Sequence, residues 1–140
     1  MKLRITKILI IFFLGCTKLF ANTDFFNDGL KLYKNEKFDE AKFKFEQDLI
    51  FNPKSELAYL YLSKIFKNQK KKDLEEQNLK AVILLNPKNE EAIFNLAKLK
   101  LESSDYKKSS ELNNRLIKMC KNFCEKSKSL KIEIENLSKK

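Results

Sequence analysis

The sequence contains no histidine and no tryptophan, and its 140 residues include only two glycines and two prolines. Without histidine the chain lacks the most common general base, a serine–histidine–aspartate triad and imidazole metal ligands. After residue 21, Gly29 is the only glycine, which excludes a glycine-rich loop that cradles phosphate. We therefore expect no enzymatic activity, no cofactor and no metal site.

The same scarcity of glycine and proline argues against β-structure, because strands joined by tight turns need these residues. Hydrophobic residues make up 43% of the chain and charged residues 34%, a balance typical of a soluble globular domain. Length and composition predict one all-α domain preceded by a short N-terminal segment.

Positive charge exceeds negative charge, with a net charge of +10. Residues 1–21 carry four basic residues and no acidic one, so 25 basic and 19 acidic residues remain, a net charge of +6. Such an excess can serve anionic lipid, acidic proteins or nucleic acid. Lysine is interspersed with glutamate along most predicted helices, and the Lys70–Lys72 run falls in a predicted turn, so we expect no nucleic-acid binding.

The N-terminus has the layout of a secretory signal: a cationic stretch, Met1–Lys7, precedes eight apolar residues, Ile8–Gly15. This apolar run is far shorter than the roughly 20 residues that span a bilayer. Cleavage after Ala21 would remove residues 1–21 as a signal peptide. The sequence FLGC, which ends at Cys16, resembles a bacterial lipobox with phenylalanine where leucine is usual. Cleavage there would remove residues 1–15 and leave Cys16 as a lipid acceptor.

Both forms of processing remain open, and an uncleaved signal anchor is the third alternative. Each predicts an exported protein of a bacterial cell envelope, either periplasmic or a membrane-anchored lipoprotein.

An internal repeat of 34 residues runs through the rest of the chain. Asn-Pro dipeptides that end at Pro53 and Pro87 are separated by this period, and a fixed period of this length indicates stacked helical hairpins. The same spacing relates three large apolar residues and three small residues: Phe25, Tyr59 and Ile93, and Gly29, Ser63 and Ala97.

The order of large, small and proline positions resembles the tetratricopeptide repeat (TPR), a helical hairpin of 34 residues. The resemblance covers residues 22–123 as three repeats, 22–55, 56–89 and 90–123, and weakens toward the third. Glu75 departs from the expected small residue, and Lys100, Asn113 and Lys121 depart from the expected tyrosine, phenylalanine and proline. The resemblance implies an all-α, TPR-like superhelix of three repeats with residues 124–140 as a C-terminal capping helix.

Helix boundaries follow from periodicity and capping signals. We expect Ser55 and Asp105 to act as N-caps and Asp73–Glu76 to form a capping box. Helices are expected over residues 23–35, 38–51, 56–69, 73–85, 90–102, 105–119 and 124–138.

Cys120 and Cys124 lie at the junction between the third repeat and the capping helix. Two thiols with no histidine nearby cannot complete a four-ligand zinc site. Export favours a structural disulfide between them, while two buried, reduced cysteines are the alternative.

In TPR proteins the first helices of successive hairpins line a concave groove that binds a peptide or a partner helix. The resemblance implies that asparagines such as Asn27 and Asn95 bond a peptide backbone and that lysines favour acidic groups, although some aromatic residues there are packing residues. The groove would contain Phe26, Asn27, Leu30, Tyr33, Lys34, Leu57, Leu60, Tyr61, Lys64, Lys67, Glu91, Phe94, Asn95, Lys98 and Leu101.

The clamp that TPR cochaperones use for a terminal carboxylate is missing from this sequence. Its lysine, arginine and asparagine positions hold Phe26, Leu30, Tyr61, Glu91 and Asn95. We therefore expect a non-catalytic envelope scaffold with a protein or peptide partner, and no chaperone-tail binding. The alternative is a basic surface binder of anionic lipid or polymer. Self-association through the last helix is also compatible with the sequence.

The first measurement is the intact mass of the processed protein from membrane and soluble fractions of its native cells. A chain that begins at Cys16 with added acyl mass would identify a lipoprotein. A chain that begins at Asn22 without lipid would identify a soluble exported protein. An unprocessed chain that carries its N-terminal methionine would contradict both forms of cleavage.

Overall fold

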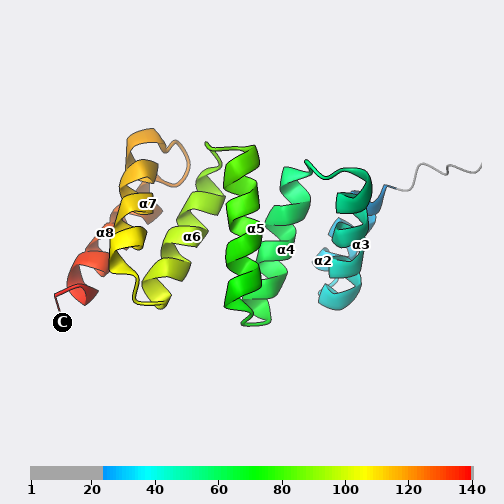
Figure 1. The fold of residues 1–140 in the computed structure, drawn as a ribbon, viewed down its shortest axis with the longest axis horizontal. Coiled ribbons are helices and arrows are strands. Elements are labelled where there is room, and N and C mark those ends of the chain that lie inside the picture. Colours follow the sequence, from blue (N-terminus) through cyan, green and yellow to red (C-terminus); the bar gives the residue numbers. More distant parts are fainter. Residues whose placement is uncertain (1–23, 140) are drawn as a thin grey trace, which may run out of the picture.

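A computed structural model describes residues 24–139, which form seven α-helices and no strand (Figure 1). The all-α prediction is confirmed, and each helix end lies within two residues of the expected one. The N-terminal segment, with Cys16, lies outside the described residues. The helices are α2 (Phe25–Lys34), α3 (Phe38–Phe51), α4 (Glu56–Asn68), α5 (Lys72–Leu85), α6 (Glu90–Glu102), α7 (Tyr106–Met119) and α8 (Cys124–Leu137).

Consecutive helices run antiparallel and form a single row of hairpins, α2–α3, α4–α5 and α6–α7, with α8 packed on α7 (Figure 1). The loops between hairpins lie along the upper edge in this view, and the turns within hairpins lie along the lower edge. No helix within residues 24–139 is both long enough and apolar enough to cross a membrane.

Small residues allow the two helices of a hairpin to approach closely. A Cβ atom placed on Gly29 would lie 2.8 Å from Cε1 of Phe45, a buried residue of α3. In the third hairpin the hydroxyl of Ser109 donates a hydrogen bond of 2.8 Å to the backbone carbonyl of Ala97. The small residues at these crossings therefore set the distance between helices.

Glu75 occupies the equivalent crossing position in the second hairpin and is buried there. Desolvation by burial raises the pKa of this carboxyl group, and the charge of Glu102 adds to the increase. Lys67 and Lys72 act in the opposite direction. The second hairpin thus places a charged group where the other two hairpins have Ala41 and Ser109.

The three turns within hairpins share an unusual backbone conformation. Glu36, Lys70 and Ser104 have φ angles of 60°, 57° and 60°, in the left-handed region that favours glycine. The residue after each one donates a backbone hydrogen bond into the last turn of the preceding helix, at 2.9–3.0 Å. This is the pattern of a Schellman C-cap.

The N-cap predictions have a mixed outcome. Asp105 caps α7 by accepting a hydrogen bond from the Lys108 amide at 3.0 Å. Ser55 occupies the N-cap position of α4, but its side chain makes no capping hydrogen bond. The prediction of a capping box at Asp73–Glu76 was wrong, because α5 begins at Lys72 and Lys71 occupies the N-cap position. The left-handed turn at Lys70 starts this helix earlier, so Asp73 and Glu75 fall within its first turn.

The hydrophobic core consists of two clusters. One joins the first hairpin to α4 through Ala41, Phe45, Ile65 and Phe66. The other runs from α4 to α8 and includes Leu130 and Ile134 of α8.

A buried polar contact accompanies the packing of α8. The Asn113 side-chain amide donates to the Ser127 carbonyl at 2.9 Å, and the Ser127 hydroxyl donates to Oδ1 of Asn113 at 2.7 Å. Both residues are almost fully buried. The phenylalanine position of the third repeat therefore holds an asparagine that fixes α8 to α7.

Replacement of Asn113 by alanine should lower the free energy of unfolding by about 1–3 kcal/mol, because it removes the closer acceptor of the buried Ser127 hydroxyl and the side-chain donor to the Ser127 carbonyl. Asn114→Ala changes the adjacent, exposed residue and should have an effect within about 0.5 kcal/mol. Urea denaturation of both variants measures the difference. Equal losses in the two variants would show that the buried pair does not stabilise the fold.

Candidate functional site

The first helices of the hairpins meet on one side of the molecule, which we call the first-helix face and define by α2, α4, α6 and α8. Between α2 and α4, the ring of Tyr61 lies 5.0 Å from that of Tyr33 and 6.0 Å from that of Phe26. Between α4 and α6, Lys64 forms an ion pair of 2.9 Å with Glu91. The structure thus brings these predicted groove residues together.

Aromatic side chains form the floor of the N-terminal half of this face. Tyr61 stacks on the buried ring of Phe45, with 5.3 Å between centroids and 17° between planes. Phe26 lies 5.7 Å from the same ring. Phe26, Tyr33 and Tyr61 are all half-buried, so they pack against the first hairpin and also present ring surface to solvent.

Two residues expected in the groove belong instead to the interior. Leu60 and Leu101 are buried members of the core cluster that extends to α8. The helical period alone does not distinguish them from the half-buried Leu30, since both kinds of position are apolar.

Asn27 lies at the N-terminus of α2 and is engaged locally. Its backbone amide donates to Oδ1 of Asp24 at 3.1 Å, and its side-chain amide donates to Oδ2 of the same residue. Asn27 therefore contributes to the cap of α2, whereas Asn95 is half-buried on α6. Lys34, Leu57 and Lys67 are exposed.

The centre of the face is electrically neutralised. Glu91 pairs with Lys64, and the Lys64 ammonium also lies 4.8 Å above the centre of the Tyr61 ring. The expectation that this lysine attracts acidic side chains needs correction, because its charge already has a partner.

The C-terminal half of the face contains a hollow of about 360 Å³ between α6 and α8. Phe94 and Lys98 line it from α6. The contribution of α8 was not predicted, and it consists of Glu125, Lys126, Ser129, Leu130 and Glu133. The first residue of α8 follows that of α6 by 34 positions, so α8 takes the place of a first helix in a fourth hairpin. The same period, continued beyond residue 123, would have predicted this placement.

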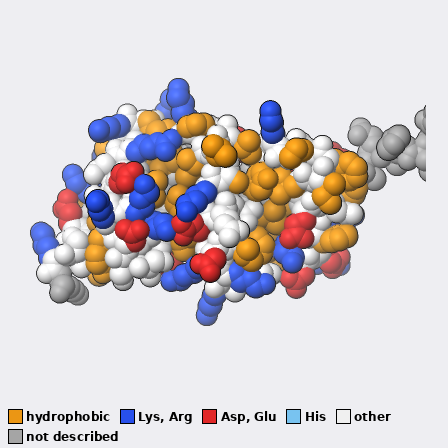
Figure 2. Space-filling model, in the orientation of Figure 1, with side chains coloured by type: hydrophobic (Ala, Val, Ile, Leu, Met, Phe, Trp, Pro, Cys, Tyr) orange, Lys and Arg blue, Asp and Glu red, His pale blue; other side chains and the backbone are white. Residues whose placement is uncertain are grey.

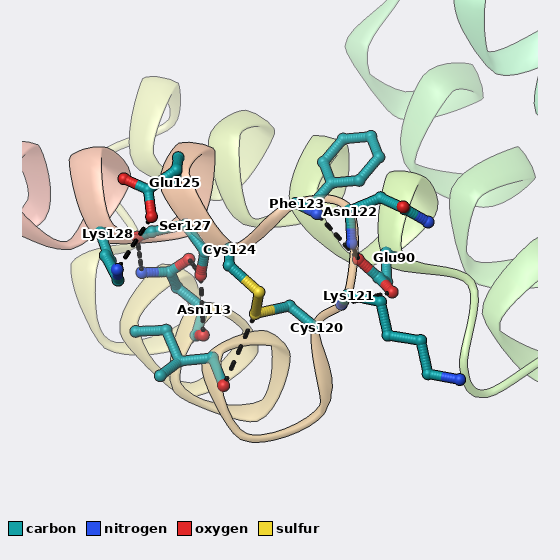
Figure 3. Close-up of a disulfide and its surroundings, with 11 residues drawn as sticks. Glu90, Asn113, Cys120, Lys121, Asn122, Phe123, Cys124, Glu125, Ser127 and Lys128 are labelled. Carbon is teal, nitrogen blue, oxygen red and sulfur yellow. Dashed lines mark hydrogen bonds and ion pairs between the residues drawn. A yellow bond between two sulfur atoms is a disulfide. The ribbon is translucent and has the colours of Figure 1, made fainter.

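A short loop, residues 120–123, leads from α7 into α8 (Figure 3). The Glu90 carboxylate accepts hydrogen bonds of 2.8–2.9 Å from three successive backbone amides, those of Lys121, Asn122 and Phe123. Desolvation acts to raise the pKa of Glu90, but the three hydrogen bonds outweigh it and lower the pKa. The first turn of α6 thereby holds the loop that leads into α8.

The two cysteines of this loop region lie side by side (Figure 3). Their sulfur atoms form a disulfide with 2.14 Å between them, and the Cα atoms are 5.3 Å apart. The bond connects the end of α7 to the first residue of α8. The disulfide has a structural role, because it links the end of one helix to the start of the next.

Within residues 24–139, no group of three or more histidine, cysteine, aspartate or glutamate side chains could hold a metal ion. The first-helix face offers ring surfaces, amides and a lysine–glutamate pair.

Solved structures with this arrangement are TPR domains. The first TPR domain of Spaghetti (RPAP3), bound to the HSP90 peptide SRMEEVD, matches with a TM-score of 0.73 and 16% identity, over 83% of this chain and 91% of that chain. The chain has a TPR-like fold. The Yersinia enterocolitica type III secretion chaperone SycD, in complex with a peptide of the translocator YopD, matches with a TM-score of 0.74 and 15% identity. That match covers 89% of this chain and 100% of the chaperone chain.

The Sgt2 TPR domain from Aspergillus fumigatus also matches, with a TM-score of 0.69 and 14% identity, over 83% of this chain and 80% of that chain. Identities this low establish the shared TPR-like fold and nothing finer. By sequence, the chain matches no protein-family profile and no curated protein.

Loss of the disulfide in a Cys120→Ser/Cys124→Ser variant should cost about 2 kcal/mol, the loop-closure value for so short a ring. Urea denaturation with and without reductant provides the measurement. The original chain should lose stability on reduction, and the double variant should not respond. Alkylation of both thiols in the unfolded, unreduced chain would contradict the disulfide.

Proposed function

We propose that this chain is a non-catalytic scaffold that binds an extended peptide or partner segment on its first-helix face. The observation that carries the proposal is the row of half-exposed rings, Phe26, Tyr33, Tyr61 and Phe94, along one side of the TPR-like stack. Aromatic side chains are frequent anchors in protein interfaces. Two proteins of the same fold were solved with bound peptides, one from HSP90 and one from YopD.

The proposed ligand is apolar at its centre. Lys64, whose ammonium lies over the Tyr61 ring, is already paired with Glu91, so this region favours an apolar or aromatic side chain of the ligand. Polar groups of the ligand would meet Asn95 and Lys98 farther along α6, next to the hollow that α8 helps to line. An acidic chain terminus like that of the HSP90 peptide is not the expected ligand, because the positions of the carboxylate clamp hold mainly apolar residues and glutamate.

The proposed location is a bacterial envelope, in periplasmic or lipid-anchored form. The cationic and apolar N-terminal segment supports export, and Cys16 supports lipid attachment. A second candidate function is binding of anionic lipid or polymer, which the net charge of +6 after residue 21 favours. Self-association through α8 is a further proposal, which the exposure of Ile132 on that helix supports.

Partner peptides can be identified by crosslinking in envelope fractions and then tested on the purified chain. Leu57 shares one side of α4 with Tyr61 and Lys64, at the spacing of helical neighbours, and is 51% exposed. Leu57→Ser should weaken peptide binding by about tenfold, equivalent to ~1.4 kcal/mol, without unfolding the chain. The affinity should persist in 1 M salt, because its main contribution is apolar.

The matched control is Phe43→Ser, which removes a 58% exposed apolar side chain from α3, a second helix. This variant should bind the peptide with unchanged affinity. Equal weakening in both variants, or none in Leu57→Ser, would place the binding surface elsewhere.

A further inference from the structure

Two similar pentapeptides end α3 and α5 and enter the loops between hairpins. They are IFNPK, residues 50–54, and LLNPK, residues 84–88, and they are 34 positions apart. We call the surface they form the NPK edge. Its large apolar side chains face solvent: Ile50 is 75% exposed, Phe51 72% and Leu84 83%. Repeated exposure of this kind marks a surface that contacts something other than water.

Both pentapeptides lie on the same edge of the molecule. Glu56, at the start of α4, accepts hydrogen bonds of 3.0 and 2.6 Å from the side chains of Asn86 and Asn89. These two hydrogen bonds place the start of α4 beside the loop between α5 and α6. Figure 2 shows hydrophobic side chains along this upper edge, with basic side chains projecting beyond them.

The chain enters its first described helix at this edge. Phe25, the first residue of α2, stacks on Phe51 with 5.4 Å between ring centroids. The predicted lipid acceptor Cys16 precedes Asp24 by eight residues, a stretch that spans at most about 28 Å when fully extended. A lipid on Cys16 would therefore keep the start of α2, and with it this side of the NPK edge, within about 28 Å of the bilayer.

The edge is also basic. Each loop between hairpins contributes an exposed lysine, namely Lys54, Lys88 and Lys121, and no ion pair involves any of the three within residues 24–139. Two carboxylates lie nearby: Glu56 accepts from two asparagine side chains, and Glu90 accepts from three backbone amides. The charge of Lys121 also lowers the pKa of Glu90. The three lysines outnumber these two carboxylates. In Figure 3 the Lys121 side chain points away from Glu90.

We propose that the NPK edge docks onto an anionic lipid bilayer, with Ile50, Phe51 and Leu84 among the headgroups and the three lysines against anionic lipid. Exposed apolar side chains beside lysines that form no ion pair are the combination that binds proteins to membrane interfaces. The apolar residues lie at two separate loops, Ile50 and Phe51 at one and Leu84 at the other, which suits insertion into a fluid surface. This docking rests on the second candidate function, binding of anionic lipid, and does not depend on peptide binding at the first-helix face.

The experiment uses the absence of tryptophan from the chain. Leu84→Trp places a single tryptophan on the NPK edge. Leu74→Trp is the matched control, since it lies on the same helix but near the opposite edge and is 37% exposed. The full chain of each variant is mixed with vesicles of phosphatidylcholine with or without phosphatidylglycerol. Quenching of tryptophan by brominated phospholipid then reports contact with lipid.

In anionic vesicles we expect at least twofold stronger quenching of Leu84→Trp than of Leu74→Trp, and little difference in neutral vesicles. Adding Lys54→Glu and Lys88→Glu to Leu84→Trp should reduce its quenching toward the control. Equal quenching at both positions, or none at either, would overturn the proposal. So would a blue shift of Leu84→Trp that grows with protein concentration without lipid, because a second copy would then cover the edge.

Discussion

The close approach of two helices within each hairpin is the constraint on which the rest of the molecule depends. At Gly29 there is no room for even a Cβ atom, because the Phe45 ring already occupies that space. At the third crossing, the Ser109 hydroxyl reaches the carbonyl of Ala97 across the same narrow gap. A larger residue at either crossing would separate the helices and change the angle at which the next hairpin stacks. Glu75 is the one larger, ionisable residue at these crossings, and desolvation by burial disfavours its charged form and raises its pKa.

The stacking brings residues that are far apart in sequence into contact. Lys64 meets Glu91 between α4 and α6, and Glu76 accepts hydrogen bonds from Lys100 of α6 and Lys80 of its own helix, which lower its pKa. Glu90 reaches the amides of residues 121–123. These polar contacts join successive hairpins around the apolar core. They also leave the first-helix face less charged than its lysine content indicates.

The fold could be predicted from sequence because its signals are local and periodic. Pro53 and Pro87 mark helix ends, and small residues recur in phase, so helix positions follow with errors of one or two residues. The site could be predicted only in part. Whether Leu60 or Tyr61 faces solvent depends on how neighbouring hairpins pack, and the partner of Lys64 lies on another hairpin. The start of α5 was misplaced because it follows from a turn conformation that Lys70 does not reveal by residue type.

The turns at Glu36, Lys70 and Ser104 share a backbone conformation but not a side-chain chemistry. An acidic, a basic and a neutral residue all adopt a left-handed φ that ordinarily favours glycine. The hairpin therefore imposes the same turn on three chemically different residues. A unit with this property can be copied in tandem and its copies can diverge at the turn without losing their shape. The backbone of the repeats can thus still show their common origin after most of the shared residues have changed.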